Sequence, residues 1–178
     1  MIIRKSNSDD LPDILSVVKE AFGGEMGVEV SELVNDLLMD ASANPMLSLL
    51  AFHEDETVGH ILFTKAQVSE SSRPLQAAIL APLAVVPKYF SQGIGGKLIK
   101  EGLNLLTESG VQLVFVLGHP GYYPSHGFIP ANPPGFEAPF QASGKAWMVQ
   151  ELSPGALEST GGQVLCADAL NELKHWRE

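Results

Sequence analysis

The chain has 178 residues, of which 45% are apolar, and it carries a formal net charge of −10 at pH 7. That length accommodates one globular domain with a sizeable core, and the acidic balance argues against general nucleic-acid binding, which requires a basic surface. A single cysteine excludes an internal disulfide framework and any zinc site built from a cysteine cluster.

The first part of the chain predicts a short strand followed by two helices. A short strand that opens with Ile2 and Ile3 comes first, and apolar residues at helical spacing then predict a helix over residues 11–22. The apolar face of this helix consists of Leu11, Ile14, Leu15, Val18 and Phe22. A Gly-Gly pair at 23–24 separates it from a second helix, which we expect near residues 29–41.

The middle of the chain predicts three strands and a third helix. The strand-like runs lie at residues 46–53, 57–68 and 75–86. A turn-like Glu-Asp-Glu sequence joins the first two, which indicates an antiparallel hairpin. A glycine-rich loop follows, and then a helix that ends near Ser109. One half of that helix is apolar, so we expect it to pack flat against a sheet.

The last part of the chain begins with a strand over residues 111–118 that is apolar nearly throughout, as in a buried strand. Residues 129–144 contain four of the twelve prolines and show no clear period. We expect a loop there, either over a site or as a surface connector. Final strands are predicted at 145–152 and 163–167, with a short helix toward Trp176.

With that last helix left aside, the predicted order is β-α-α-β-β-β-α-β-α-β-β. This order indicates an α/β (α+β) fold with a mixed central sheet and helices on both faces, in one domain over residues 1–178. The N-terminus turns polar after three residues, and the longest apolar run, 75–86, is too short to span a bilayer. We therefore expect a soluble, cytoplasmic protein.

The sequence YFSQGIGGKLI at residues 89–99 is typical of a phosphate-binding loop that opens a helix. It does not match the nucleotide-triphosphate P-loop, because Ser91 stands at the leading glycine and Leu98 replaces the magnesium-binding hydroxyl residue. It does not match the dinucleotide fingerprint either, since Leu98 again falls where the third glycine is required.

A third pattern fits. The segment LAVVPKYFSQGIGGKL resembles the acetyl-CoA-binding segment of the GNAT superfamily of N-acetyltransferases. The matching positions are Val85, Pro87, Tyr89, Gly93, Ile94 and Gly95. Phe90 stands where the superfamily has Gln or Arg, and Gln92 is a candidate replacement donor.

A second segment, VFVLGHPGYYPSHGFIPA at 114–131, is similar to a later part of the same superfamily and is closest to its YhbS-like branch. There a strand leads into a short helix with a tyrosine four residues before Gly-Phe, and Tyr123 has that spacing. The departures are His119, where the branch has Asp, and Ser125-His126, where Arg-Phe is common. The resemblance covers roughly residues 1–130, and the remaining Pro/Gly-rich loop and C-terminal strands lie outside it.

This resemblance implies a GNAT-like single-domain fold and acetyl-CoA as cosubstrate. Backbone groups of Leu83, Ala84 and Val85 would pair with pantetheine as an added strand would. The pyrophosphate would be held by the loop and helix start, that is by Phe90, Ser91, Gln92, Gly93, Ile94, Gly95, Gly96 and Lys97. Four basic residues with no acid among them surround this loop, namely Arg73, Lys88, Lys97 and Lys100, although such lysines can also be merely solvated.

For catalysis, the resemblance assigns Tyr123 as the hydrogen-bond or proton donor to the departing thiolate, with a packing tyrosine as the alternative. His119 is the candidate base, because the strand before the glycine loop carries no acid. Glu25 and Glu29, expected between the first two helices, are candidates for the acceptor side. No metal site is predicted, because the histidines lack ligand spacing.

The predicted function is acetyl transfer from acetyl-CoA to a primary amine by direct transfer. The alternatives are a non-catalytic acyl-CoA-binding or sensor module and an enzyme that transfers another acyl group. Polyamines, amino acids, peptide N-termini and protein lysines all suit an acidic enzyme as acceptors. We expect no nucleic-acid or membrane partner, and dimers are common in the superfamily.

Overall fold

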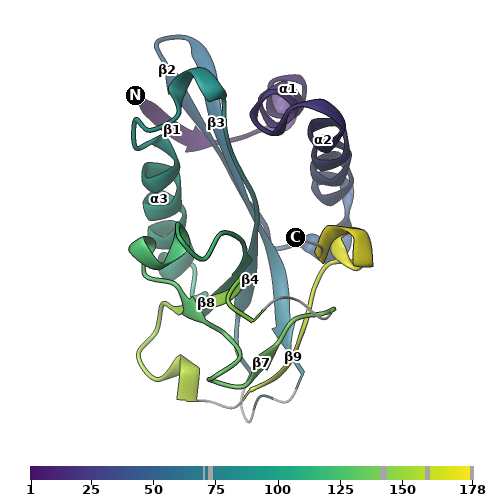
Figure 1. Cartoon of the computed structure of the whole chain (residues 1–178), viewed down its shortest axis with the longest axis vertical. Coiled ribbons are helices and arrows are strands. Elements are labelled where there is room, and N and C mark those ends of the chain that lie inside the picture. The colour runs from purple at the N-terminus through teal and green to yellow at the C-terminus, as the bar shows by residue number, and fades with distance from the viewer. Residues whose placement is uncertain (70, 72–73, 141–143, 159–160, 177–178) are drawn as a thin grey trace.

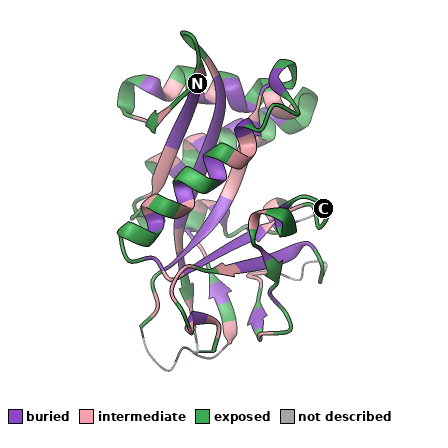
Figure 2. Cartoon of the chain, turned by 90° about the vertical axis from the view of Figure 1, so that its left-hand side faces the viewer, coloured by how far each residue is buried: buried purple, intermediate pink, exposed green. Residues whose placement is uncertain are grey.

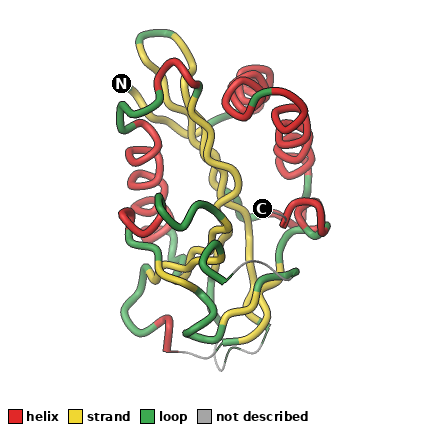
Figure 3. The backbone as a smooth tube through the Cα atoms, in the orientation of Figure 1, coloured by secondary structure: helices red, strands yellow, loops and turns green. Residues whose placement is uncertain are grey.

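A long mixed β-sheet runs through the middle of the molecule and separates two groups of helices (Figure 1). The computed structural model describes residues 1–69, 71, 74–140, 144–158 and 161–176. Helices α1 (Leu11–Phe22) and α2 (Gly24–Met39) lie on one side of the sheet, and α3 (Ile94–Glu108) lies on the other, as the backbone trace also shows (Figure 3). The predicted mixed sheet with helices on both faces is confirmed.

The order of strands in the main path of the sheet is β1-β2-β3-β4-β5-β8-β6, with β9 paired to β3 and β7 paired to β9. The bounds are β1 (Ile2–Lys5), β2 (Leu47–His53), β3 (Glu56–Val68), β4 (Ala77–Val85), β5 (Leu113–Leu117), β6 (Ile129–Pro130), β7 (Phe136–Glu137), β8 (Trp147–Glu151) and β9 (Gly162–Leu165). β4 and β5 run parallel, as do β7 and β9, and the other pairs are antiparallel. The predicted hairpin is β2–β3.

The turn between α1 and α2 is shorter than the sequence suggested. Gly23 and Gly24 both have positive φ, +70° and +54°, and reverse the chain in two residues. The second helix therefore begins at Gly24 and not near residue 29, so Glu25 and Glu29 lie within α2 and not between the helices. This corrects the predicted position of both glutamates.

Helix α3 approaches the sheet closely because glycines lie on both sides of the contact between them. A Cβ atom at Gly102 would collide with the Phe63 ring of β3, and one at Gly59 would lie 3.0 Å from Leu98 Cδ1. The buried face of α3 carries Ile94, Leu98, Ile99, Gly102 and Leu106. Figure 2 shows the outward face of this helix exposed and the strands behind it buried. The helix start is thereby fixed against β3 and β4.

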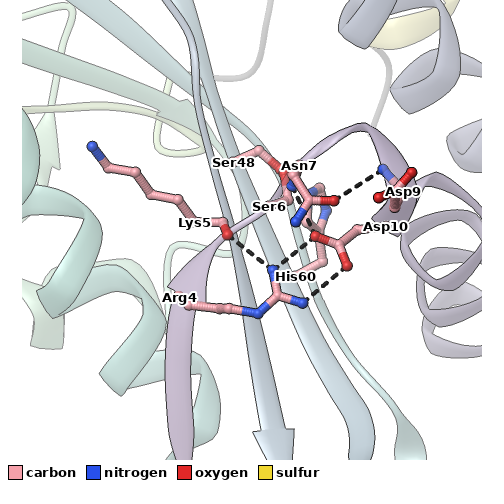
Figure 4. A network of polar contacts seen from close by, with 8 residues as sticks. All are labelled: Arg4, Lys5, Ser6, Asn7, Asp9, Asp10, Ser48 and His60. Atoms are coloured by element: carbon pink, nitrogen blue, oxygen red, sulfur yellow. Dashed lines mark hydrogen bonds and ion pairs between the residues drawn. The ribbon is translucent and has the colours of Figure 1, made fainter.

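A polar network ties β1 to β2, β3 and the start of α1 (Figure 4). Arg4 donates two hydrogen bonds, of 2.7 and 2.9 Å, to the Asp10 carboxylate, which also accepts from the Asn7 backbone N–H. These bonds lower the pKa of Asp10 to about 2, chiefly through Arg4. Deeper in the sheet, the hydroxyl of Ser48 contacts Ser6 Oγ at 2.7 Å and His60 Nε2 at 2.8 Å.

The segment expected as an irregular loop, 129–144, contains two short strands. β6 pairs with β8, and β7 pairs with β9, so the segment is tied to the sheet at both points; its residues 141–143 lie outside the described part of the chain. Trp147 on β8 stacks on Phe115 of β5 at 5.3 Å and donates from Nε1 to the Phe136 carbonyl at 3.1 Å. The predicted terminal helix is two short 3₁₀ turns, at Asp168–Leu170 and Leu173–Trp176.

Candidate functional site

The two central parallel strands separate at their carboxyl ends. β4 pairs with β5 from Ala77 opposite Leu113 as far as Leu80 opposite Val116, and β4 then continues to Val85 with only β3 beside it in the described part of the chain. The backbone N–H of Val86 donates to Val58 on β3.

Backbone groups alternate in direction along a strand, so those of Ala84 also face β3, whereas those of Leu83 and Val85 face the gap beside β5. Of the three residues predicted to pair with pantetheine, Leu83 and Val85 offer a free edge and Ala84 does not.

The glycine loop follows this edge through a 3₁₀ turn at Pro87–Tyr89. Ser91 and Gly93 both have positive φ, +63° and +79°, which turns the chain sharply into α3. Phe90, Ser91 and Gln92 are exposed, and Phe90 has 54% of its surface accessible. The tip of the loop is therefore open to solvent.

The start of α3 is an open set of amide donors. Its first helical hydrogen bond runs from the N–H of Lys97 to the carbonyl of Gly93, so the N–H groups of Ile94, Gly95 and Gly96 precede the helical ladder. Unpaired N–H groups and the helix dipole make this end electropositive, which suits a phosphate group. The N–H of Lys97 is used inside the helix, and only its exposed side chain remains for a ligand.

The basic residues near the loop differ in their availability. Lys88 forms an ion pair with Glu56 at 3.8 Å, and the Tyr89 hydroxyl donates to the same carboxylate at 3.0 Å. Lys97 and Lys100 are exposed, and within the described residues neither has an ion-pair partner. Arg73 lies outside the described residues.

The other wall of the gap comes from the segment after β5. His119 is exposed, and its carbonyl accepts from the N–H groups of Tyr122 and Tyr123 at 3.0 and 3.3 Å. These bonds lead into a 3₁₀ turn, Tyr123–His126, where the sequence predicted a short helix. Gly118 lacks a Cβ where the Tyr123 ring packs, so the end of β5 and this ring are in direct contact.

Tyr123 is buried between Tyr122 and Phe128, with ring centroids 5.1 and 5.6 Å away in edge-to-face geometry. Burial, and secondarily Tyr122, raise the pKa of the Tyr123 phenol above its usual range. The phenol is therefore a neutral hydrogen-bond donor at physiological pH.

Two residues that the sequence left unassigned lie over the helix start. A Cβ on Gly95 would fall 2.6 Å from the hydroxyl of Tyr122 and 3.5 Å from Leu83 Cδ2, and one on Gly96 would fall 3.0 Å from Cε1 of His126. Tyr122 and His126 are four residues apart, at the two ends of the 3₁₀ turn, and their rings contact each other with centroids 4.8 Å apart. That spacing was the available signal, but only the fold shows that this pair meets the glycine loop.

The two residues predicted for the acceptor side, Glu25 and Glu29, lie on α2 and therefore far along the chain from the glycine loop. Glu25 and Glu29 are exposed, one turn apart on α2. Within the described residues no group of three or more His, Cys, Asp or Glu side chains could hold a metal ion. No helix in the described ranges is long and apolar enough to cross a membrane.

The profile of the acetyltransferase (GNAT) domain matches residues 2–131. The chain belongs to the GNAT acetyltransferase family. It is 45% identical over 168 residues to the uncharacterized N-acetyltransferase YjhQ of Escherichia coli K12, covering 92% of this chain and 90% of YjhQ. It is also 32% identical over 165 residues to YhbS of the same strain, with 92% and 95% covered.

Solved structures of GNAT proteins agree with this assignment. YhbS from Escherichia coli, solved in complex with CoA, superposes with a TM-score of 0.86 at 31% identity and covers 96% of this chain and 92% of YhbS. A GNAT acetyltransferase from Brucella melitensis, solved with acetyl-CoA, gives a TM-score of 0.73 at 28% identity, with 95% and 97% covered. The resemblance read from the two sequence segments is confirmed.

Proposed function

We propose that this GNAT protein is an N-acetyltransferase that moves the acetyl group of acetyl-CoA to a primary amine by direct transfer. The observation that carries the proposal is the free edge of β4 at Leu83 and Val85, which ends beside the amide donors of Gly95 and Gly96. An extended arm and a diphosphate, joined as they are in coenzyme A, match these two features in order. The CoA and acetyl-CoA complexes of the two solved relatives support it.

Each part of the site has its own binding task in this proposal. Leu83 and Val85 pair with the pantetheine arm, and the N–H groups of Ile94, Gly95 and Gly96 receive the diphosphate. Phe90, Ser91, Gln92 and Gly93 shape the loop, and the Lys97 side chain adds positive charge at its exposed rim. When bound, acetyl-CoA would supply the activated acetyl thioester.

Deprotonation of the acceptor is the first chemical requirement. An alkyl ammonium of pKa about 10.4 loses its proton at pH 7 at a cost of about 4.6 kcal/mol. His119, exposed at the end of β5, is the residue that we propose to take this proton. The amine nitrogen then bonds to the acetyl carbon, the carbon–sulfur bond breaks, and the second proton that the nitrogen loses ends on the departing thiolate, so that the products are the amide and the free thiol.

Tyr123 acts on the leaving group. Its neutral phenol donates a hydrogen bond to the sulfur as negative charge develops there, and that bond strengthens as the carbon–sulfur bond breaks. Cys166 does not carry the acetyl group, because burial, with Asp168 adding to it, raises the pKa of its thiol to about 11 and leaves it protonated. Direct transfer, without an acyl-enzyme intermediate on this cysteine, is therefore the route that we propose.

A non-catalytic acyl-CoA-binding module is the second candidate function. The observation that favours it is the absence of any acidic residue from Ala77 to Val85, the strand beside the proposed thioester. Turnover of acetyl-CoA with any amine in an acceptor screen would exclude it. Glu25 and Glu29 remain candidates for attracting a cationic acceptor. Transfer of an acyl group other than acetyl is the remaining alternative, and the same screen with another acyl-CoA as donor tests it.

Replacing Gly95 with valine tests the binding proposal. The new side chain would meet the Tyr122 hydroxyl at 2.6 Å and Leu83 Cδ2 at 3.5 Å, where the diphosphate and pantetheine would join. Overpacking of this kind costs about 1–3 kcal/mol, so CoA should bind about 10- to 100-fold more weakly by titration calorimetry. Gly144→Ala, in an exposed turn where a Cβ meets only Asn132 at 3.4 Å, is the control and should bind normally. Unchanged CoA affinity in Gly95→Val would contradict the assignment of the glycine loop to coenzyme A.

A further inference from the structure

Tyr122 and His126 form a wall that lies against the first turn of α3 at Gly95 and Gly96. The Tyr122 hydroxyl lies 2.6 Å from the position of a Gly95 Cβ, and His126 Cε1 lies 3.0 Å from that of a Gly96 Cβ. Both glycines therefore leave room for side chains from the segment after β5. The Tyr122 hydroxyl and the His126 ring thus lie against the two residues whose N–H groups precede the ladder of α3.

A ring contact and two hydrogen bonds hold the wall in place. The two rings contact each other with centroids 4.8 Å apart and planes tilted by 54°. Gln150 on β8 donates from Nε2 to the His126 carbonyl at 2.8 Å, and Ser125 Oγ donates to the Tyr122 carbonyl at 2.8 Å. The backbone of the turn is thus pinned to the sheet, and its side chains do not have to be ordered when a ligand arrives.

The chemistry of the two side chains suits an anion. Tyr122 is 37% exposed, and burial of the rest of its ring raises the pKa of its phenol, so it remains a neutral O–H donor. His126 is half-buried, and its imidazole offers a ring N–H as a donor. Neither residue carries negative charge, and the exposed Lys97 lies on the same first turn of α3.

Resting on the proposed function, we infer that Tyr122 and His126 bind the diphosphate of coenzyme A next to the α3 amides. The diphosphate is then bound both by the backbone N–H groups of the helix start and by the phenol and imidazole that lie against that start. The 3′-phosphate is not their ligand, because both side chains lie over Gly95 and Gly96, which belong to the helix start.

The test measures the affinity of the full chain for CoA and for dephospho-CoA, which keeps the diphosphate and lacks the 3′-phosphate, by titration calorimetry. The variants are His126→Phe, which keeps the ring, His126→Gln, which keeps a donor, and Tyr122→Phe. His175→Gln, in the C-terminal 3₁₀ turn, is the matched control. Melting of each variant without ligand verifies that it folds.

We expect His126→Phe and Tyr122→Phe to weaken both ligands equally, by about 10-fold each, with a smaller loss for His126→Gln and none for His175→Gln. A loss confined to CoA would move the contact to the 3′-phosphate and overturn the inference. Unchanged affinities in the three variants would overturn it too, while leaving the proposed function intact. A wild-type chain that binds neither ligand would overturn the proposed function and this inference together.

Discussion

Tyr123 is placed by contacts that leave little freedom to its ring. The Cδ2–Cε2 side of the ring packs against Gly118, and the Tyr122 and Phe128 rings lie in edge-to-face geometry with it. The sequence predicted this tyrosine from its spacing to Gly-Phe. It did not indicate how buried the phenol is, because burial depends on Gly118 and on side chains from both flanks of the turn. His119, by contrast, is exposed, which leaves its ring accessible to an acceptor.

Tyr123→Phe should lower turnover while leaving CoA binding intact. The phenol is proposed to interact with the sulfur only as charge develops, and a hydrogen bond to a charged group contributes about 1.5–3 kcal/mol, so kcat should fall about 10- to 100-fold. Thiol release from acetyl-CoA with an accepted amine gives kcat, and calorimetry gives the CoA affinity. Equal turnover in the variant would remove its catalytic role, and an equal loss in affinity would make it a binding residue.

At the scale of elements, periodicity predicted nearly all helices and strands. The errors fall where a tight turn or pairing with a distant strand sets the bounds of an element. The start of α2 was misplaced by about five residues because Gly23 and Gly24 make the turn in a single step. β6 and β7 have no sequence period of their own, since each is two residues long and exists only through pairing with β8 and β9.

Sequence alone could also not reveal which edge of β4 is free. β4 separates from β5 where their pairing stops, at Leu80 and Val116. The sequence of β4 is uncharged along its whole length, so nothing in it marks that point. The contact of Tyr122 and His126 with the glycine loop is likewise a consequence of the parallel β4–β5 pair. That pair brings the segments following both strands to the same end of the sheet.

We expect His60 to make the junction of β1, β2 and β3 sensitive to pH. Its side chain is fully buried, and burial lowers its pKa from 6.5 to about 4. The unfolded chain takes up a proton below pH 6.5, whereas the folded chain does not until about pH 4. Stability contributed by neutral His60 is therefore present above pH 6.5 and is lost as the pH falls through this window, by up to about 3 kcal/mol.

Urea unfolding of wild type and His60→Leu at several pH values between 7 and 4 measures this effect. The difference in the free energy of unfolding between the two should change by about 3 kcal/mol in favour of the variant as the pH falls. Asp10 and His175 are present in both proteins, so the effects of their titration cancel in the difference. Parallel pH profiles for the two proteins would contradict the prediction.

At the scale of the whole molecule, the C-terminal part completes the sheet on which the site is built. The family match ends at residue 131, but β8 pairs with β5 along its whole length, and Trp147 stacks on Phe115. Gln150 of β8 also holds the turn that carries Tyr122 and His126. The residues beyond the recognisable segments thus support the wall opposite the glycine loop. The soluble, cytoplasmic location and the homodimer stay predictions.

The most direct test of the central claim is thermal unfolding of the chain with acetyl-CoA, CoA, ATP or NAD, each at saturating concentration. A ligand at about 100 times its Kd stabilises a fold by about 2.7 kcal/mol, which raises Tm by about 5–10 °C for a domain of this size. We predict a rise with acetyl-CoA and CoA and none with ATP or NAD. No rise with CoA, or a larger one with ATP, would contradict the assignment of the free β4 edge and the glycine loop to coenzyme A.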